Sequence, residues 1–121
     1  MKEETKKWLK KAEMDIKTAN YNFEGNIHDA AIFYSQQAVE KALKALQIEG
    51  FNRFDKTHDL INLAKSINAD KRILELCDKI NPSYFVSRYP DIEKNYNKEE
   101  VKEILNASKE VLEWMKKRLK S

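Results

Sequence analysis

Glycine and proline are scarce in this chain, and that scarcity is what most limits the folds it can adopt. Two glycines and two prolines occur in 121 residues. Because these residues mark many turns and breaks, the sequence favours long helices and disfavours folds that need many tight β-turns. The length corresponds to a single domain over 1–121, which is large enough to bury a core without cross-links.

Hydrophobic spacing places the first two helices. One is predicted at about 4–23, where apolar residues recur at three- and four-residue steps, and Gly25-Asn26 follows as a stop. The next is predicted at about 28–49, ended by Gly50. It is rich in alanine and apolar over most of its circumference, which is typical of a helix at the centre of a bundle. Its polar residues form a narrow strip made of Gln37, Lys41 and Lys44, with Glu40 and Gln47 nearby.

Two shorter helices are predicted next. Thr57 is the expected N-cap of a third helix at roughly 58–67, and Asp70 can cap a fourth. Asn81-Pro82 then breaks or kinks that fourth helix, because the residue before a proline disfavours helical backbone angles.

The C-terminal third combines an irregular stretch with the clearest amphipathic helix. The stretch at 81–96 is aromatic and irregular. Asn97 and Glu100 have the spacing of a capping box and open a last helix at about 98–119. Together the elements predict an all-α protein, a bundle of four or five helices.

Composition excludes several classes of function. Lys and Arg total 23 and Asp and Glu total 20, and the resulting net charge of +3 falls short of a dedicated DNA-coating protein. Cys77 is the only cysteine, which excludes an internal disulfide or a cysteine-based metal site and fits a reducing cytoplasm. No Walker loop, Gly-rich dinucleotide turn or His-Glu-x-x-His helix is present, so no metal or other cofactor is expected.

Membrane association is not expected either. No apolar run approaches the ~18 residues needed to span a bilayer. The N-terminus leads into no long apolar core of the kind found in signal peptides. The expected location is the cytoplasm.

The first candidate site lies around Arg53 and His58. A histidine at a helix N-terminus feels the positive end of the helix dipole, which disfavours protonation of the ring. A neutral imidazole can accept a proton from a ribose 2′-hydroxyl while an arginine steadies the phosphate charge. The alternative is structural: Thr57 caps the helix, His58 caps or packs, and Asp59 interacts favourably with the dipole.

A second candidate is the segment Ser87-Arg88-Tyr89-Pro90-Asp91. Arg88 can make a bidentate contact with phosphate, and Tyr84 or Tyr89 can stack on a base. The alternative is that the aromatic residues close one end of the bundle while Arg88 pairs with Asp91 or another carboxylate.

A third candidate is the basic character of both chain ends. If the first and last helices run antiparallel, their lysine-rich ends meet and can attract RNA. A solvated charged surface is the favoured interpretation, because acidic residues are interspersed. The basic residues are Lys6, Lys7, Lys10, Lys11, Lys116, Lys117, Arg118 and Lys120.

Three segments give the chain a resemblance to a known family. They are the stretch from Gln36 to Leu46, Thr57-His58-Asp59-Leu60, and Arg88-Tyr89-Pro90-Asp91. The chain resembles the HEPN domain family, including the small prokaryotic members encoded beside minimal nucleotidyltransferases. The resemblance implies an up-and-down four-helix bundle with an additional short helix. It also implies a homodimer and a minimal nucleotidyltransferase partner.

The resemblance further implies a function and the residues that carry it. Ribonuclease members have an arginine followed after four to six residues by a histidine, which Arg53 and His58 match as catalytic candidates. Asp59, Arg88, Tyr89 and Asp91 are then candidates for binding nucleotide, RNA or the partner. The implied function is RNA or nucleotide binding, with metal-independent RNA cleavage in active members of a toxin–antitoxin-like system. The alternative is a non-catalytic subunit that presents nucleotide or substrate to the nucleotidyltransferase.

Overall fold

The computed structural model describes residues 1–120, which form six helices and no strand. The helices are α1 (Glu3–Glu24), α2 (His28–Phe51), α3 (Leu60–Ser66), α4 (Lys71–Ile80), α5 (Ser83–Val86) and α6 (Lys98–Lys120).

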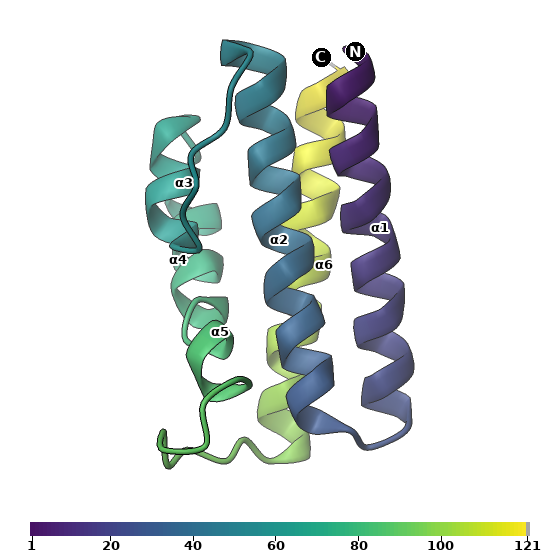
Figure 1. The fold of residues 1–121 in the computed structure, drawn as a ribbon, viewed down its shortest axis with the longest axis vertical. Coiled ribbons are helices and arrows are strands. Elements are labelled where there is room, and N and C mark those ends of the chain that lie inside the picture. The colour runs from purple at the N-terminus through teal and green to yellow at the C-terminus, as the bar shows by residue number, and fades with distance from the viewer. Residues whose placement is uncertain (121) are drawn as a thin grey trace.

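Four helical segments form an up-and-down bundle (Figure 1). Helix α1 descends in that view, α2 ascends, α4 and α5 descend together, and α6 ascends. Helix α3 is the additional short helix, inserted between α2 and α4. Both chain ends lie at the same end of the bundle. The expected all-α architecture is therefore confirmed.

Helix α2 lies at the centre, as its alanine-rich sequence predicts. It packs against each of the other five helices, and α1 makes its most extensive contact. Four of its alanines, at positions 31, 38, 42 and 45, are completely buried. Small side chains let neighbouring helix backbones come close. Cys77 of α4 is also fully buried and packs in the same core.

One predicted helix end needs correction, and another is confirmed. Helix α2 continues through Gly50 to Phe51, and Asn52 ends it with a left-handed backbone, φ 58°. Glycine is only moderately unfavourable inside a helix, so the helix can continue past Gly50. Asparagine tolerates the left-handed conformation that ends the helix. After α1, the predicted stop at Gly25-Asn26 is confirmed, because Gly25 is the C-cap and Asn26 has a positive φ of 61°.

The start of α3 and the stretch after α4 also differ from the prediction. Helix α3 begins at Leu60 with Asp59 as N-cap, because the Asp59 carboxylate accepts hydrogen bonds from the Ile61 and Asn62 amides. Thr57 instead accepts a bond from the Asp59 amide. Within the stretch expected to be irregular, residues 83–86 form one helical turn, α5.

The caps predicted for α4 and α6 are confirmed. The Asp70 carboxylate accepts a hydrogen bond from the Ile73 amide. Asn97 and Glu100 bond each other's backbone amides at 2.8 and 3.1 Å, the reciprocal geometry of a capping box. None of the helices in the described part of the chain combines the length and apolar character needed to cross a bilayer.

Candidate functional site

Glu40 of α2 is the centre of a buried polar cluster. Its side chain is 8% exposed, yet it accepts hydrogen bonds from Lys44 at 3.0 Å and Gln36 at 3.2 Å, and contacts the His58 ring at 2.9 Å. Burial by itself raises the pKa of this carboxyl. The hydrogen bonds from His58, Lys44 and Gln36 outweigh burial, so the pKa of Glu40 is lowered. Glu40 is therefore an ionised acceptor inside the protein.

His58 is held by this carboxylate at one ring nitrogen. The atom facing Glu40 Oε1 is Nδ1. Because an ionised carboxylate only accepts, Nδ1 must carry the hydrogen, and Nε2 of a neutral ring then carries the lone pair. The His58 side chain is 52% exposed, in contrast to Glu40. The geometry gives an oriented imidazole at the surface with a buried anion behind it.

Tyr84 and Arg88 extend the site beyond the histidine. The Tyr84 ring stacks on the His58 ring with centroids 4.2 Å apart and planes 18° apart. The Arg88 guanidinium lies 4.6 Å from the Tyr84 centroid and 5.8 Å from that of Tyr89. Cation–aromatic contacts of this kind orient a guanidinium without using its hydrogen-bond donors. His58, Arg88 and Tyr89, which belong to two separate sequence candidates, thus lie on one contiguous surface.

Asp59 is adjacent to this surface but its carboxylate has structural partners. Besides capping α3, its Oδ1 accepts a hydrogen bond from Asn81 at 3.2 Å. Asn81 in turn accepts a bond from the Leu60 amide at 2.9 Å. These bonds connect the start of α3 to the end of α4, and so fix the position of the neighbouring His58.

Arg53 has its contacts elsewhere, and no described contact joins Asp91 to the stack. Arg53 pairs with Asp55 at 2.9 Å, lies 5.9 Å from the Phe51 ring centroid, and is exposed. Asp91 is exposed in the segment after α5. Neither makes a described contact with His58, and their assigned roles remain sequence-based predictions.

The buried polar residues of α2 belong to the site, although their sequence pattern alone does not predict it. Gln36 was treated as part of the alanine-rich stretch, and Glu40, Lys44 and Gln47 as a polar strip. In the structure all four are buried, because the segment after α2 and helix α3 cover them. Positions 36, 40, 44 and 47 follow helical spacing, so one buried polar face was the available signal. Among residues 1–120 no cluster of three His, Cys, Asp or Glu side chains is arranged to hold a metal ion.

Comparisons with known proteins give consistent matches. The model of the HEPN domain family matches residues 5–119. ST0689, described as an archaeal HEPN homologue, has a crystal structure similar to this one, with TM-score 0.80 and 30% identity over 98% of each chain. TT1696 from Thermus thermophilus has TM-score 0.86 and 22% identity, covering 93% of this chain and 96% of that one. A comparison with curated proteins finds no match.

Proposed function

Because this chain belongs to the HEPN domain family, we propose that it is an RNA- or nucleotide-binding protein that uses the surface formed by His58, Arg88 and Tyr89. The buried Tyr84 ring supports His58 and Arg88 from below. The observation that carries the proposal is the oriented imidazole: buried Glu40 holds Nδ1, and half of the His58 side chain is exposed. The same contact also stabilises the buried Glu40 carboxylate, so it serves the fold as well as the orientation of the ring. The neighbouring tyrosine and arginine supply groups that favour bases and phosphates.

We further propose metal-independent RNA cleavage at this surface. His58 Nε2 takes the proton from a ribose 2′-hydroxyl, and the O2′ atom attacks the adjacent phosphorus. The bond from phosphorus to the 5′ oxygen breaks, and that oxygen takes a proton from water. The products are a 2′,3′-cyclic phosphate and a 5′-hydroxyl. Arg88 binds the phosphate during the reaction through its guanidinium donors.

RNA cleavage by the purified protein in EDTA tests this proposal. We expect cutting that leaves a cyclic phosphate, and loss of cutting in His58→Ala. His28→Ala is the matched control, since His28 begins α2 and has no described contact with the site. Arg53→Ala tests the sequence-based catalytic role of Arg53, and cleavage at the wild-type rate would exclude it.

The second candidate function is a non-catalytic subunit that presents RNA or nucleotide to a nucleotidyltransferase partner. The exposed pair of Arg88 and Tyr89 favours it, because a guanidinium and an aromatic ring can bind a phosphate and a base without any proton transfer. Wild type and His58→Ala would then bind RNA and both fail to cut it.

We also propose a minimal nucleotidyltransferase as partner, on the basis of family membership. Such a partner should be encoded next to this chain with a Gly-Ser…Asp-x-Asp pattern. Co-expression followed by purification of a stable complex is the direct test. Failure of the two folded proteins to associate would contradict the pairing and leave the RNA-binding proposal intact.

A further inference from the structure

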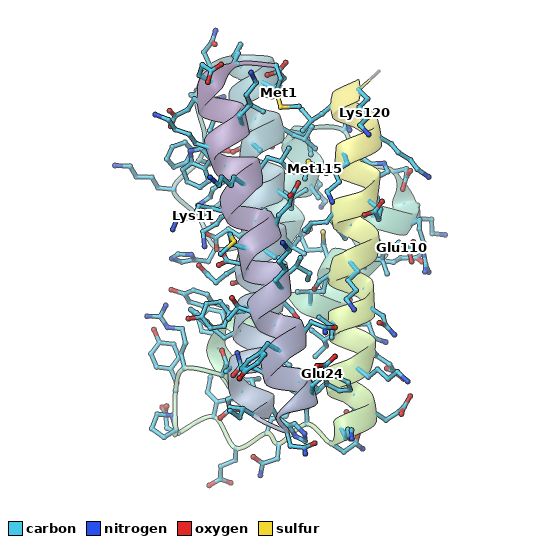
Figure 2. All side chains as sticks on the ribbon, turned by 90° about the vertical axis from the view of Figure 1, so that its right-hand side faces the viewer. Met1, Lys11, Glu24, Glu110, Met115 and Lys120 are labelled. Atoms are coloured by element: carbon cyan, nitrogen blue, oxygen red, sulfur yellow. The ribbon has the colours of Figure 1, made fainter. Side chains whose placement is uncertain are left out.

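A hollow on the exposed side of α1 and α2 carries unpaired positive charge beside an aromatic ring. It is lined by Lys7, Trp8, Lys11, Asp15 and Lys41. Lys41 and Asp15 form an ion pair and so offset each other. Within residues 1–120, neither Lys7 nor Lys11 has a described carboxylate partner, and both are exposed. Figure 2 shows Lys11 projecting away from α1 into solvent.

The Trp8 indole in this hollow is fixed in place. Its Nε1 donates a hydrogen bond to Glu4 at 3.2 Å, and its ring lies 4.6 Å from the Phe54 ring, centroid to centroid. Trp8 is only partly buried, so some of the ring stays accessible. A fixed aromatic ring between two unpaired lysines is a combination that suits single-stranded nucleic acid.

The hollow is connected to the His58 surface by a continuous series of contacts. The Lys44 ammonium lies 5.5 Å from the centroid of the Phe54 ring that Trp8 touches. Lys44 pairs with Glu40, which holds His58. The hollow and the His58 surface are therefore linked through Phe54 and the buried Lys44 and Glu40.

Some cations elsewhere on the bundle are paired with carboxylates. On α6, Lys116 lies within 3.6 Å of Glu113 and 3.8 Å of Glu13. Between α4 and α6, Arg72 binds Glu110 through two hydrogen bonds of 2.9 Å, and Lys79 pairs with Glu103 at 3.0 Å. Those cations are paired with carboxylates. Within residues 1–120, Lys7 and Lys11 have no such partner, as is also true of other exposed lysines such as Lys102 and Lys117, and what distinguishes Lys7 and Lys11 is the Trp8 ring beside them in the hollow.

We propose that Lys7, Trp8 and Lys11 form a second contact for single-stranded RNA, which binds the backbone of a strand whose other part lies at His58 and Arg88. The preferred ligand is then a strand of several nucleotides, because a mononucleotide cannot occupy both regions. This inference rests on the proposed function and specifies its substrate class. Each lysine neutralises one phosphate and releases its counterions on binding.

The experiment compares Lys7→Gln/Lys11→Gln with a control of equal charge change, Lys102→Gln/Lys117→Gln. Both control lysines are exposed on α6, and neither lines the hollow. Fluorescence anisotropy measures binding of a single-stranded oligouridylate of about ten nucleotides over a range of salt concentrations. Competition by uridine monophosphate measures binding at the His58 surface alone.

We expect the Lys7/Lys11 variant to bind the oligouridylate about tenfold more weakly than wild type near physiological salt. The slope of log affinity against log salt should fall in magnitude by about 1.4, which is two contacts at about 0.7 each. Its affinity for uridine monophosphate should match wild type. The control variant should keep most of the oligonucleotide affinity.

Two results would overturn the inference, and they are distinguishable. If the Lys7/Lys11 variant and the control bind the oligonucleotide equally well, and Arg88→Lys weakens uridine monophosphate binding, the second contact is wrong and the proposed function stands. If folded wild-type protein binds neither ligand, the proposed function itself fails, and the second contact fails with it.

Discussion

Glu40 shows how one buried charge can set the chemistry of an exposed neighbour. Its carboxylate is enclosed by Lys44, Gln36 and His58, and it stays ionised because their hydrogen bonds outweigh the cost of burial. The same bonds that stabilise the anion also fix the tautomer of His58. Stability and site chemistry therefore depend on the same side chain.

Replacing Glu40 with glutamine should destabilise the protein at neutral pH. The substitution leaves the Lys44 ammonium, 6% exposed, without its counter-charge. Breaking a buried pair from one side costs about 3 kcal/mol. Urea denaturation measures the loss. Lys6→Gln is the control, because it breaks an exposed pair with Glu3 and should cost no more than ~0.5 kcal/mol.

The pH dependence of that loss has a definite sign. The pKa of Glu40 is lowered from 4.5 in the folded state. Its contribution is therefore fully present above the unfolded value and disappears as pH falls through the folded one. The stability difference between wild type and Glu40→Gln should shrink in acid. A difference that stays constant from neutral pH to well below that range would show that the charge of Glu40 is not what stabilises the fold.

Arg88→Lys should affect binding more than folding. The side chain is exposed, and lysine keeps the charge while losing the planar fork that meets a phosphate with two hydrogen bonds. We expect a change in unfolding free energy of no more than ~0.5 kcal/mol and a clear loss of affinity for uridine monophosphate. A large loss of stability with unchanged affinity would identify Arg88 as a clamp between α5 and the bundle.

At the scale of elements, the short helices depend on contacts from distant parts of the chain. Helix α3 has seven residues, too few to be stable alone. Its first turn is held by the Asp59 cap and by Asn81, which comes from the end of α4. The N-cap was assigned to Thr57 from sequence because threonine also favours this position. In the structure the Asp59 carboxylate accepts the Ile61 and Asn62 amides, and Asn81 adds a tertiary contact to the same oxygen.

Asp59→Ala should therefore destabilise the protein by about 2 kcal/mol, at the upper end for an N-cap. The mutation removes the acceptor of two amides and of Asn81. Thr57→Ala, which removes one acceptor from the Asp59 amide, should cost less than half as much. If chemical denaturation gave equal losses of unfolding free energy for the two variants, Thr57 would contribute to the start of α3 as much as Asp59 does.

Gly50 offers the opposite case, a position where a substitution should stabilise. It lies inside α2, and no atom lies within 4 Å of a Cβ placed there. Gly50→Ala should raise the unfolding free energy by about 0.5–1 kcal/mol, because alanine favours the helix and restricts the unfolded chain. Thermal melting checks the sign. A lower melting temperature would mean that the last turn of α2 needs glycine for a reason outside its local geometry.

The long helices and their order could be predicted because each carries a sustained apolar period. The candidate site could be predicted only in pieces. His58 and Arg88 are each recognisable from local sequence, but the Tyr84 ring that joins them depends on how α5 packs against α2. Glu40 was not assigned because a charged residue on a helix is usually exposed, and here a separate segment covers it.

At the scale of the whole molecule, we propose a homodimer on the basis of family membership. One chain has a mass of 14.3 kDa. Light scattering of the purified protein at tens of micromolar should give twice that mass. A monomer at that concentration would contradict the proposal. The proposed RNA contacts lie within a single chain, so a monomer would leave their tests unchanged.

The buried thiol of Cys77 can report on local opening of the bundle. Burial raises the pKa of its thiol to about 12. At about pH 8 the reactive thiolate is therefore strongly disfavoured in the folded protein. A thiol reagent can therefore react with Cys77 only when α4 opens away from the core. The rate of labelling reports how often that opening occurs. A single cysteine means a single label per chain, so mass spectrometry can follow it. Cys77 should be labelled faster in Glu40→Gln than in wild type, because a less stable fold opens more often.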